Sequence, residues 1–158
     1  YRHVNGPLWY MTTKVLICDD SNMARKQMSR ALPDNWPTDV TFAKNGQEAI
    51  DIIKAGGQEL MFLDLTMPVL DGYQTLEAIR KDDLPIMVIV VSGDIQPEAR
   101  RQVLAMGALD FIKKPINIGL ELFTLDVLTC HQNLNAIDFI SKLIIGFLKV
   151  FHSVPHCL

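Results

Sequence analysis

Five short apolar runs recur along the first two thirds of the chain, and each one ends in or is followed by polar residues. Valine, leucine and isoleucine are their commonest residues. Runs of this length that stay apolar throughout are typical of strands buried on both faces of a sheet. The pattern therefore predicts five strands, over residues 14–18, 39–43, 60–65, 86–93 and 108–115, the second of them a weaker strand.

Helical periodicity fills the gaps between these runs. In the first gap Met28 and Leu32 lie on one side of a helix that Ser21 or Asp20 can cap. Pro97 stands where the first turn of a helix tolerates proline. Strands that alternate with helices through short connections predict an α/β fold, a doubly wound five-stranded parallel sheet with helices on both faces. The four helices are expected over residues 22–32, 46–57, 73–81 and 98–107.

The pattern changes after Pro115. Residues 116–132 and 134–151 both show helical periodicity, and the second segment is apolar around much of its circumference. Such a surface needs a partner. It fits helices packed across or exchanged between the chains of a homodimer, or the truncated start of an output domain. A helix on a membrane surface is least favoured, because Lys142 and Lys149 are its only cations.

These patterns divide the chain into three parts. Residues 1–12 show no periodicity and are interpreted as a tag or disordered extension. Residues 13–130 form the α/β domain, and residues 131–158 form an extra C-terminal helical segment, an apolar tail. Its longest apolar block, residues 143–148, is too short to span a bilayer, so no membrane insertion is expected.

Side chains that carry chemistry stand at the carboxyl ends of four predicted strands. In a doubly wound sheet, ligands bind outside these ends. Three carboxylates there would repel one another, by about 4 kcal/mol for a pair 4 Å apart at a protein surface, and a hard divalent cation such as Mg²⁺ offsets this. A lysine supplies a fixed charge for a phosphoryl group, and a partly desolvated aspartate can act as its nucleophile. The five side chains are Asp19, Asp20, Asp64, Ser92 and Lys114.

Composition narrows the classes of function. The net charge is −3, and the basic residues are scattered, so we expect no nucleic-acid partner. Three cysteines without paired spacing indicate a reducing compartment, most simply the cytoplasm. A glycine-rich nucleotide-binding loop of the Walker type is absent from the sequence, as is a helix-turn-helix module.

Four motifs carry a resemblance to a known family. They are "VLICDDS", "LMFLDLTMPVLDGYQTLEAIR", "MVIVVSG" and "GALDFIKKPI", and they span roughly residues 13–118. In order and spacing they resemble the receiver domain of bacterial two-component response regulators, especially chemotaxis regulators. The resemblance implies a flavodoxin-like receiver over residues 13–130.

The resemblance also implies roles for individual residues. Asp64 is expected to be the phosphoacceptor, and Asp20 and Asp64 to bind Mg²⁺ (or Mn²⁺) directly. The main-chain carbonyl of Thr66 would complete the protein ligands, and Asp19 would act through a metal-bound water. Lys114, in a cis linkage to Pro115, would contact the phosphoryl group.

Further positions concern switching. Ser92 corresponds to the family's switch hydroxyl and Phe111 to its switch aromatic. Many relatives carry tyrosine where Phe111 stands. Phe111 has no hydroxyl, so an inward movement of its ring could signal to a partner only through shape and packing. Thr66 and Asp94 lie at positions that tune phosphoryl lifetime. Gly93 is expected to leave the site open to a small donor or a phosphatase residue.

The leading hypothesis is a phosphorylation-activated response regulator. A sensor histidine kinase or phosphotransfer protein would donate the phosphoryl group to Asp64, and the switched protein would signal to an unknown output partner. Its only catalysis would be its own phosphorylation and dephosphorylation, so it would not be classed as an enzyme. Two alternatives remain open. One is a receiver that controls a fused chemotaxis-type phosphatase domain, and the other is a non-phosphorylated pseudo-receiver that serves as an interaction module.

Overall fold

The structure is a computed structural model that describes residues 12–32, 34, 36–93 and 96–116. Several predictions fall outside the described residues. They concern the N-terminal extension over residues 1–11, the lifetime-tuning position Asp94, and residues 117–158. In that last range two helices, and a homodimer formed through them, were predicted.

Five parallel strands form a single sheet in the order β2-β1-β3-β4-β5. This confirms the predicted five-stranded parallel sheet. The order reverses direction between β1 and β3, and such a reversal is the topological switch point at which doubly wound folds bind ligands. The strands are β1 (Thr13–Cys18), β2 (Thr38–Ala43), β3 (Leu60–Leu63), β4 (Met87–Ser92) and β5 (Asp110–Lys113).

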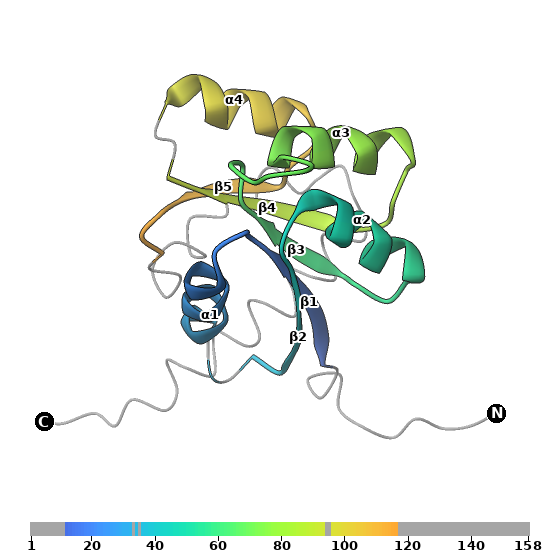
Figure 1. Cartoon of the computed structure of the whole chain (residues 1–158), viewed down its shortest axis with the longest axis vertical. Helices are drawn as coiled ribbons and strands as arrows, with labels where there is room; N and C mark the ends of the chain where they lie inside the picture. The colour runs from blue at the N-terminus through green and yellow to red at the C-terminus, as the bar shows by residue number, and fades with distance from the viewer. Residues whose placement is uncertain (1–11, 33, 35, 94–95, 117–158) are drawn as a thin grey trace, which may run out of the picture.

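Helices cover both faces of the sheet, as predicted. Helix α1 lies on one face, and α2, α3 and α4 lie on the other (Figure 1). Every helix within the described residues is too short or too polar to cross a membrane. The helices are α1 (Asn22–Ala31), α2 (Gly46–Ala55), α3 (Gly72–Lys81) and α4 (Pro97–Ala105).

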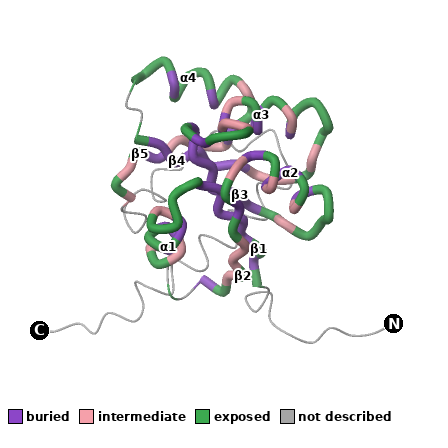
Figure 2. Tube along the Cα trace, in the orientation of Figure 1, coloured by how far each residue is buried: buried purple, intermediate pink, exposed green. Residues whose placement is uncertain are grey.

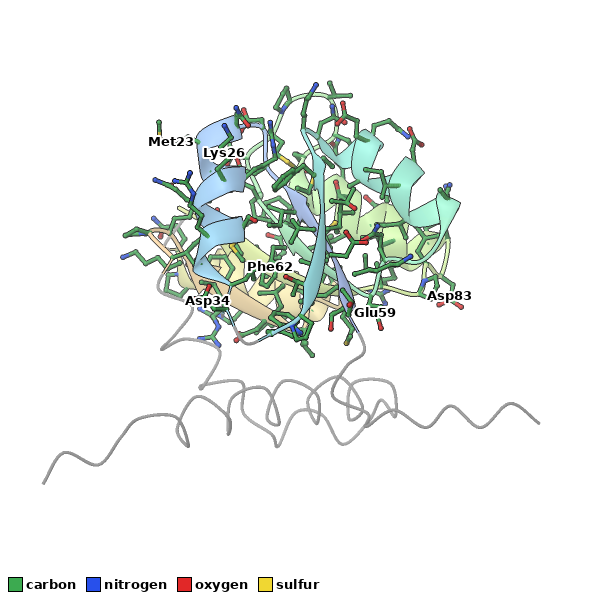
Figure 3. The ribbon with its side chains drawn as sticks, turned by 90° about the horizontal axis from the view of Figure 1, so that it is seen from below. Met23, Lys26, Asp34, Glu59, Phe62 and Asp83 are labelled. Carbon is green, nitrogen blue, oxygen red and sulfur yellow. The ribbon has the colours of Figure 1, made fainter. Side chains whose placement is uncertain are left out.

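Two hydrophobic clusters, one on each face, explain why the central strands β3 and β4 are apolar on both sides. Leu63 of β3 packs in the cluster beneath α2, α3 and α4, whereas its neighbour Phe62 packs in the cluster beneath α1 (Figure 3). Both side chains are buried, and Figure 2 shows that burial follows the central strands. Burial of one such side chain contributes about 1.5–3 kcal/mol, so both faces of β3 hold the fold together.

The strand register brings the chemistry to one edge. Cys18, the last residue of β1, pairs with Leu63, the last residue of β3. The residues that follow them, Asp19 and Asp64, therefore leave the sheet side by side. The main-chain N–H of Asp64 donates to the carbonyl of Cys18 at 2.9 Å, which holds the two strand ends together. On the other side, Ser92 pairs with Lys113.

Local caps begin the helices near this edge. The Ser21 side chain accepts a hydrogen bond from the N–H of Ala24, so Ser21 rather than Asp20 caps α1. Asp71 caps α3 in a capping box with Gln74. Such caps contribute about 1 kcal/mol each. They start both helices directly after the loops that carry the acidic residues.

Three strands are shorter than the sequence predicts: β4 and β5 lose residues at both ends, and β3 loses two at its carboxyl end. The third apolar run was expected to be a strand over residues 60–65, but β3 ends at Leu63. Leu65 is buried without belonging to the strand, and its carbonyl accepts a hydrogen bond from Gly72 at the start of α3. The apolarity of Leu65 thus reflects packing of the loop, and Asp64 lies just beyond the sheet.

Candidate functional site

Three carboxylates converge at the carboxyl edge of the sheet. Asp19 and Asp20 follow β1, Asp64 follows β3, and one carboxylate oxygen from each lies within 4.8 Å of the others. Asp19 and Asp64 are buried and Asp20 is exposed. Buried charges of one sign are unfavourable unless a counter-charge compensates them, so this cluster requires positive charge.

Lys114 supplies part of that positive charge. Its Nζ atom lies 2.6 Å from Oδ2 of Asp19 and 2.8 Å from Oδ1 of Asp64, so one ammonium bridges the two buried carboxylates. Burial lowers the pKa of Lys114, but its hydrogen bonds and charge interactions with both aspartates outweigh burial and leave the pKa above its ordinary value. The Lys114–Pro115 peptide bond is cis, as the resemblance implied.

Asp64 is only 6% exposed and is held by the main chain around it. The N–H of Thr66 donates to its Oδ2 atom at 3.0 Å. Burial is the largest influence on Asp64 and raises its pKa, against the opposing hydrogen bond and charge of Lys114. The neighbouring charge of Asp19 raises the pKa further. The two carboxylate oxygens of Asp64 have different partners: Oδ1 contacts Lys114, and Oδ2 contacts the loop at Thr66.

The start of α3 approaches the back of Asp64 closely. A Cβ atom at Gly72 would lie 2.7 Å from Cα of Leu65 and would also overlap the carbonyl oxygen of Asp64. Glycine is therefore required at this position by close approach of two backbone segments. No local pattern in the sequence indicates this contact between Gly72 and the acidic site, and it emerges from the tertiary structure.

The loop between β1 and α1 holds the other two carboxylates. The N–H of Ser21 donates to Oδ1 of Asp19 at 2.8 Å. The guanidinium of Arg25 donates to the main-chain carbonyls of Asp19 and Asp20, at 2.6 and 3.1 Å. Sequence reasoning missed Arg25. The only signal was an arginine on the first turns of a helix that begins at the acidic pair.

The predicted switch residues lie on β4 and β5. Ser92 is the last residue of β4, is 1% exposed, and accepts a main-chain hydrogen bond from Lys114 at 2.9 Å. Phe111 is half-buried against the cluster beneath α2, α3 and α4. A Cβ atom at Gly93, the residue after Ser92, would meet nothing within 4 Å among the described residues.

Cys18 lies beneath the site but is buried and unreactive. It is 1% exposed, and its Sγ atom lies 3.6 Å from Sδ of Met67. Burial, followed by the charges of Asp19 and Asp64, raises the pKa of the thiol to about 12. A thiol with such a pKa stays protonated at neutral pH, so it packs as a small apolar residue.

The donor set fits a hard divalent cation. Mg²⁺ prefers carboxylate and carbonyl oxygens with several waters. Three carboxylates face one ammonium, so Lys114 leaves the cluster with a net negative charge. Asp20 is exposed, so water can reach this side of the cluster. The chemistry of the residues present therefore matches a Mg²⁺ site rather than a soft-metal site.

A family model of the response regulator receiver domain matches residues 15–122. The chain belongs to this family. The fold, the acidic pocket of Asp19, Asp20 and Asp64, and Lys114 are consistent with a receiver that accepts a phosphoryl group. The predicted receiver resemblance is thus confirmed.

A curated relative has receiver-like sequence within a longer protein. The protein-glutamate methylesterase/protein-glutamine glutaminase of Geobacillus kaustophilus is 39% identical to this receiver over 116 residues. The match covers 71% of this chain and 33% of that protein. The receiver therefore spans about a third of the length of this relative.

Two solved structures are similar to this receiver and contain partner proteins. One is a co-crystal of the Saccharomyces cerevisiae histidine phosphotransfer protein Ypd1 with the receiver domain of Ssk1. It has a TM-score of 0.61 at 29% identity and covers 67% of this chain and 81% of that chain. The other is the CheX-CheY-BeF3-Mg²⁺ complex of Borrelia burgdorferi. It has a TM-score of 0.62 at 26% identity and covers 88% of this chain and 89% of that chain.

Proposed function

We propose that this receiver is phosphorylated on Asp64 by a phosphohistidine of a sensor kinase or phosphotransfer protein, and that phosphorylation switches its contact with an output partner. One observation carries the proposal. Asp64 is buried at the topological switch point, within 4.8 Å of two further carboxylates and 2.8 Å from the ammonium of Lys114. A turn-capping aspartate needs neither the second acidic group nor the lysine.

Magnesium is the proposed cofactor, with Mn²⁺ as a substitute. Asp20, Asp64 and the main-chain carbonyl of Thr66 would hold the cation, and Asp19 would act through a bound water. The cation supplies charge neutralisation for the phosphoryl oxygens during transfer. Its proposed ligands lie on two adjacent loops, and the Thr66 N–H already orients Asp64.

In the proposed transfer step, a carboxylate oxygen of Asp64 attacks phosphorus. The new O–P bond forms as the bond from phosphorus to the donor nitrogen breaks, and the imidazole leaves with the electron pair of that bond. Lys114 keeps a positive charge beside the transferring oxygens, because its raised pKa keeps it protonated at neutral pH. Hydrolysis of the acyl phosphate by water restores Asp64.

Switching is proposed to run through Ser92 and Phe111. Ser92 ends β4 at the same edge as Asp64, and its carbonyl is hydrogen-bonded to Lys114. A phosphoryl group on Asp64 would draw the Ser92 hydroxyl toward it. Phe111 packs on the cluster that includes Val103 of α4, so a change at β4 would alter how α4 and β5 present their outer surface.

The proposed donor and output partners are proteins. A phosphotransfer protein accompanies the similar yeast receiver, and CheX accompanies the similar Borrelia protein, and these precedents support the proposal. A second candidate function is control of a catalytic domain in the same protein. The methylesterase relatives favour it, because the matched region is about a third of their length.

Intact-mass measurement tests the proposal. The full chain is incubated with a small phosphodonor, with and without Mg²⁺, and the mass is followed over time. We expect the mass of one phosphoryl group to be added only with Mg²⁺, and no addition to Asp64→Asn. Unmodified wild-type protein would instead support the pseudo-receiver, and equal modification of Asp64→Asn would place the acceptor elsewhere.

A further inference from the structure

Arg25 is a buried cation beside the acidic site, with no role in the proposed function so far. It lies on α1 and is 8% exposed. Within the described residues its side-chain hydrogen bonds both end on main-chain carbonyls, those of Asp19 and Asp20, at 2.6 and 3.1 Å. A guanidinium so close to carboxylates usually pairs with them. Because Arg25 instead donates to main-chain oxygens, the carboxylate oxygens remain available to another cation.

Asp19 and Asp20 depend on this contact to different degrees. Asp19 is also held through its N–H, which donates to Ala43 at 3.2 Å, and through its carboxylate, which accepts from Ser21 at 2.8 Å. Asp20 is exposed, and within the described residues its main-chain carbonyl accepts a hydrogen bond from Arg25. The direction of the Asp20 side chain therefore depends most on Arg25.

We propose that Arg25 is a positioning residue for metal binding: it fixes the main chain of Asp19 and Asp20 so that both carboxylates face Asp64. This inference rests on the proposed Mg²⁺ site. The same nitrogen, Nη1, makes both bonds, and the backbone N–H of Arg25 donates to the carbonyl of Ser21 at 3.0 Å. The first turn of α1 thus holds the acidic loop through its main chain.

Positioning and electrostatics predict opposite results when Arg25 is removed. A nearby positive charge repels Mg²⁺, so a purely electrostatic role predicts tighter binding in Arg25→Met. A positioning role predicts weaker binding, because Asp20 loses its orientation. Loss of a group that orients metal ligands typically weakens metal affinity about 10–100-fold.

The experiment measures the Mg²⁺ dissociation constant of the full chain by isothermal titration calorimetry, at a temperature where circular dichroism shows each variant folded. The set comprises wild type, Arg25→Met, Arg25→Lys and Lys26→Met. Lys26 is exposed on the same helix and labelled in Figure 3, so its substitution controls for general loss of charge. Asp20→Asn serves as the loss-of-ligand reference.

We expect Arg25→Met to bind Mg²⁺ at least tenfold more weakly than wild type, and Lys26→Met to bind as wild type does. Arg25→Lys keeps the charge but not the geometry of the guanidinium, so its affinity should fall between those of wild type and Arg25→Met. Unchanged or tighter binding by Arg25→Met overturns the inference. If Arg25→Met does not fold, wild-type affinity in Arg25→Lys overturns it instead.

Failure of the proposed function gives a different result. Wild type that binds no Mg²⁺, or Asp20→Asn that binds it as tightly as wild type, would refute the metal site itself. Weakened thermal stability in Arg25→Met and Arg25→Lys with unchanged Mg²⁺ affinity would assign Arg25 to the fold alone and overturn only the positioning role.

Discussion

The Nζ atom of Lys114 lies 2.8 Å from Oδ1 of Asp64, although fifty residues separate them in the chain. The same Nζ atom lies 2.6 Å from Oδ2 of Asp19. One ammonium thus offsets two buried carboxylates before any ligand arrives. Because the pKa of Asp64 is nevertheless raised, by burial above all, the compensation is incomplete, and the site retains a demand for positive charge.

Removal of this ammonium should slow phosphorylation. We expect Lys114→Met to lower the rate of phosphoryl transfer from a small donor by about a hundredfold, as for other preorganised groups that stabilise developing negative charge. Intact-mass time courses at saturating Mg²⁺ measure the rate. Lys113→Met, at the exposed neighbouring position, is the matched control and should react at the wild-type rate. Equal rates in both variants would remove Lys114 from the proposed mechanism.

Asp64 should oppose folding at neutral pH when no metal is bound. Its pKa in the folded protein lies above the ordinary value of 3.8, so the folded state binds more protons than the unfolded state between the two values. Stability therefore falls as pH rises through that window. Asp64→Asn lacks this charge, and we expect it to melt at a higher temperature than wild type at pH 7 in EDTA.

The advantage of Asp64→Asn should shrink as the pH falls through the raised pKa and vanish below 3.8, where Asp64 becomes neutral in both states. Melting curves by circular dichroism over this range provide the measurement. Asp39→Asn changes an exposed carboxylate on β2 and serves as the control. An Asp64→Asn protein that is less stable than wild type at pH 7 would contradict the direction of the shift.

Magnesium should stabilise the folded protein through the acidic cluster. At a free concentration one hundred times the dissociation constant, a ligand that binds only the folded state adds about 2.7 kcal/mol. We expect that increase for wild type and a much smaller one for Asp20→Asn, measured by urea unfolding with Mg²⁺ or EDTA. Glu59→Gln removes an exposed carboxylate at the opposite edge of the sheet and should respond as wild type does. A full response in Asp20→Asn would exclude Asp20 as a ligand.

Gly72 should tolerate no side chain. A Cβ atom there would overlap the carbonyl of Asp64 and approach Cα of Leu65 to 2.7 Å, so the loop must shift. We expect Gly72→Ala to destabilise the protein by about 1–3 kcal/mol, as overpacking usually does, and to slow phosphorylation as Asp64 moves. Gly93→Ala meets nothing within 4 Å and is the control for stability. Similar unfolding midpoints for Gly72→Ala and Gly93→Ala would contradict this expectation, because they would show that the backbone at Asp64 shifts at little cost in stability.

The candidate site was predictable to the level of residues but not of contacts. Asp19, Asp64 and Lys114 were each expected at a strand's carboxyl end, because parallel strands bring those ends to one edge, and the structure brings their side chains into contact. Thr66 was expected to offer a carbonyl, and the structure adds the bond from its N–H to Asp64. Arg25 was missed, because its position in a helix gives no indication of the oxygens its guanidinium reaches.

The sequence by itself determined the alternation of strands and helices, the burial of the central strands on both faces, and the edge on which the acidic residues and lysine appear. These properties follow from local periodicity and from the geometry of parallel sheets. Only the tertiary structure decided that β3 ends at Leu63, that Gly72 lies against Asp64, and that Lys114 bridges two aspartates. These contacts join residues as far as 95 positions apart, so they depend on strand order, register and loop packing rather than on any local pattern.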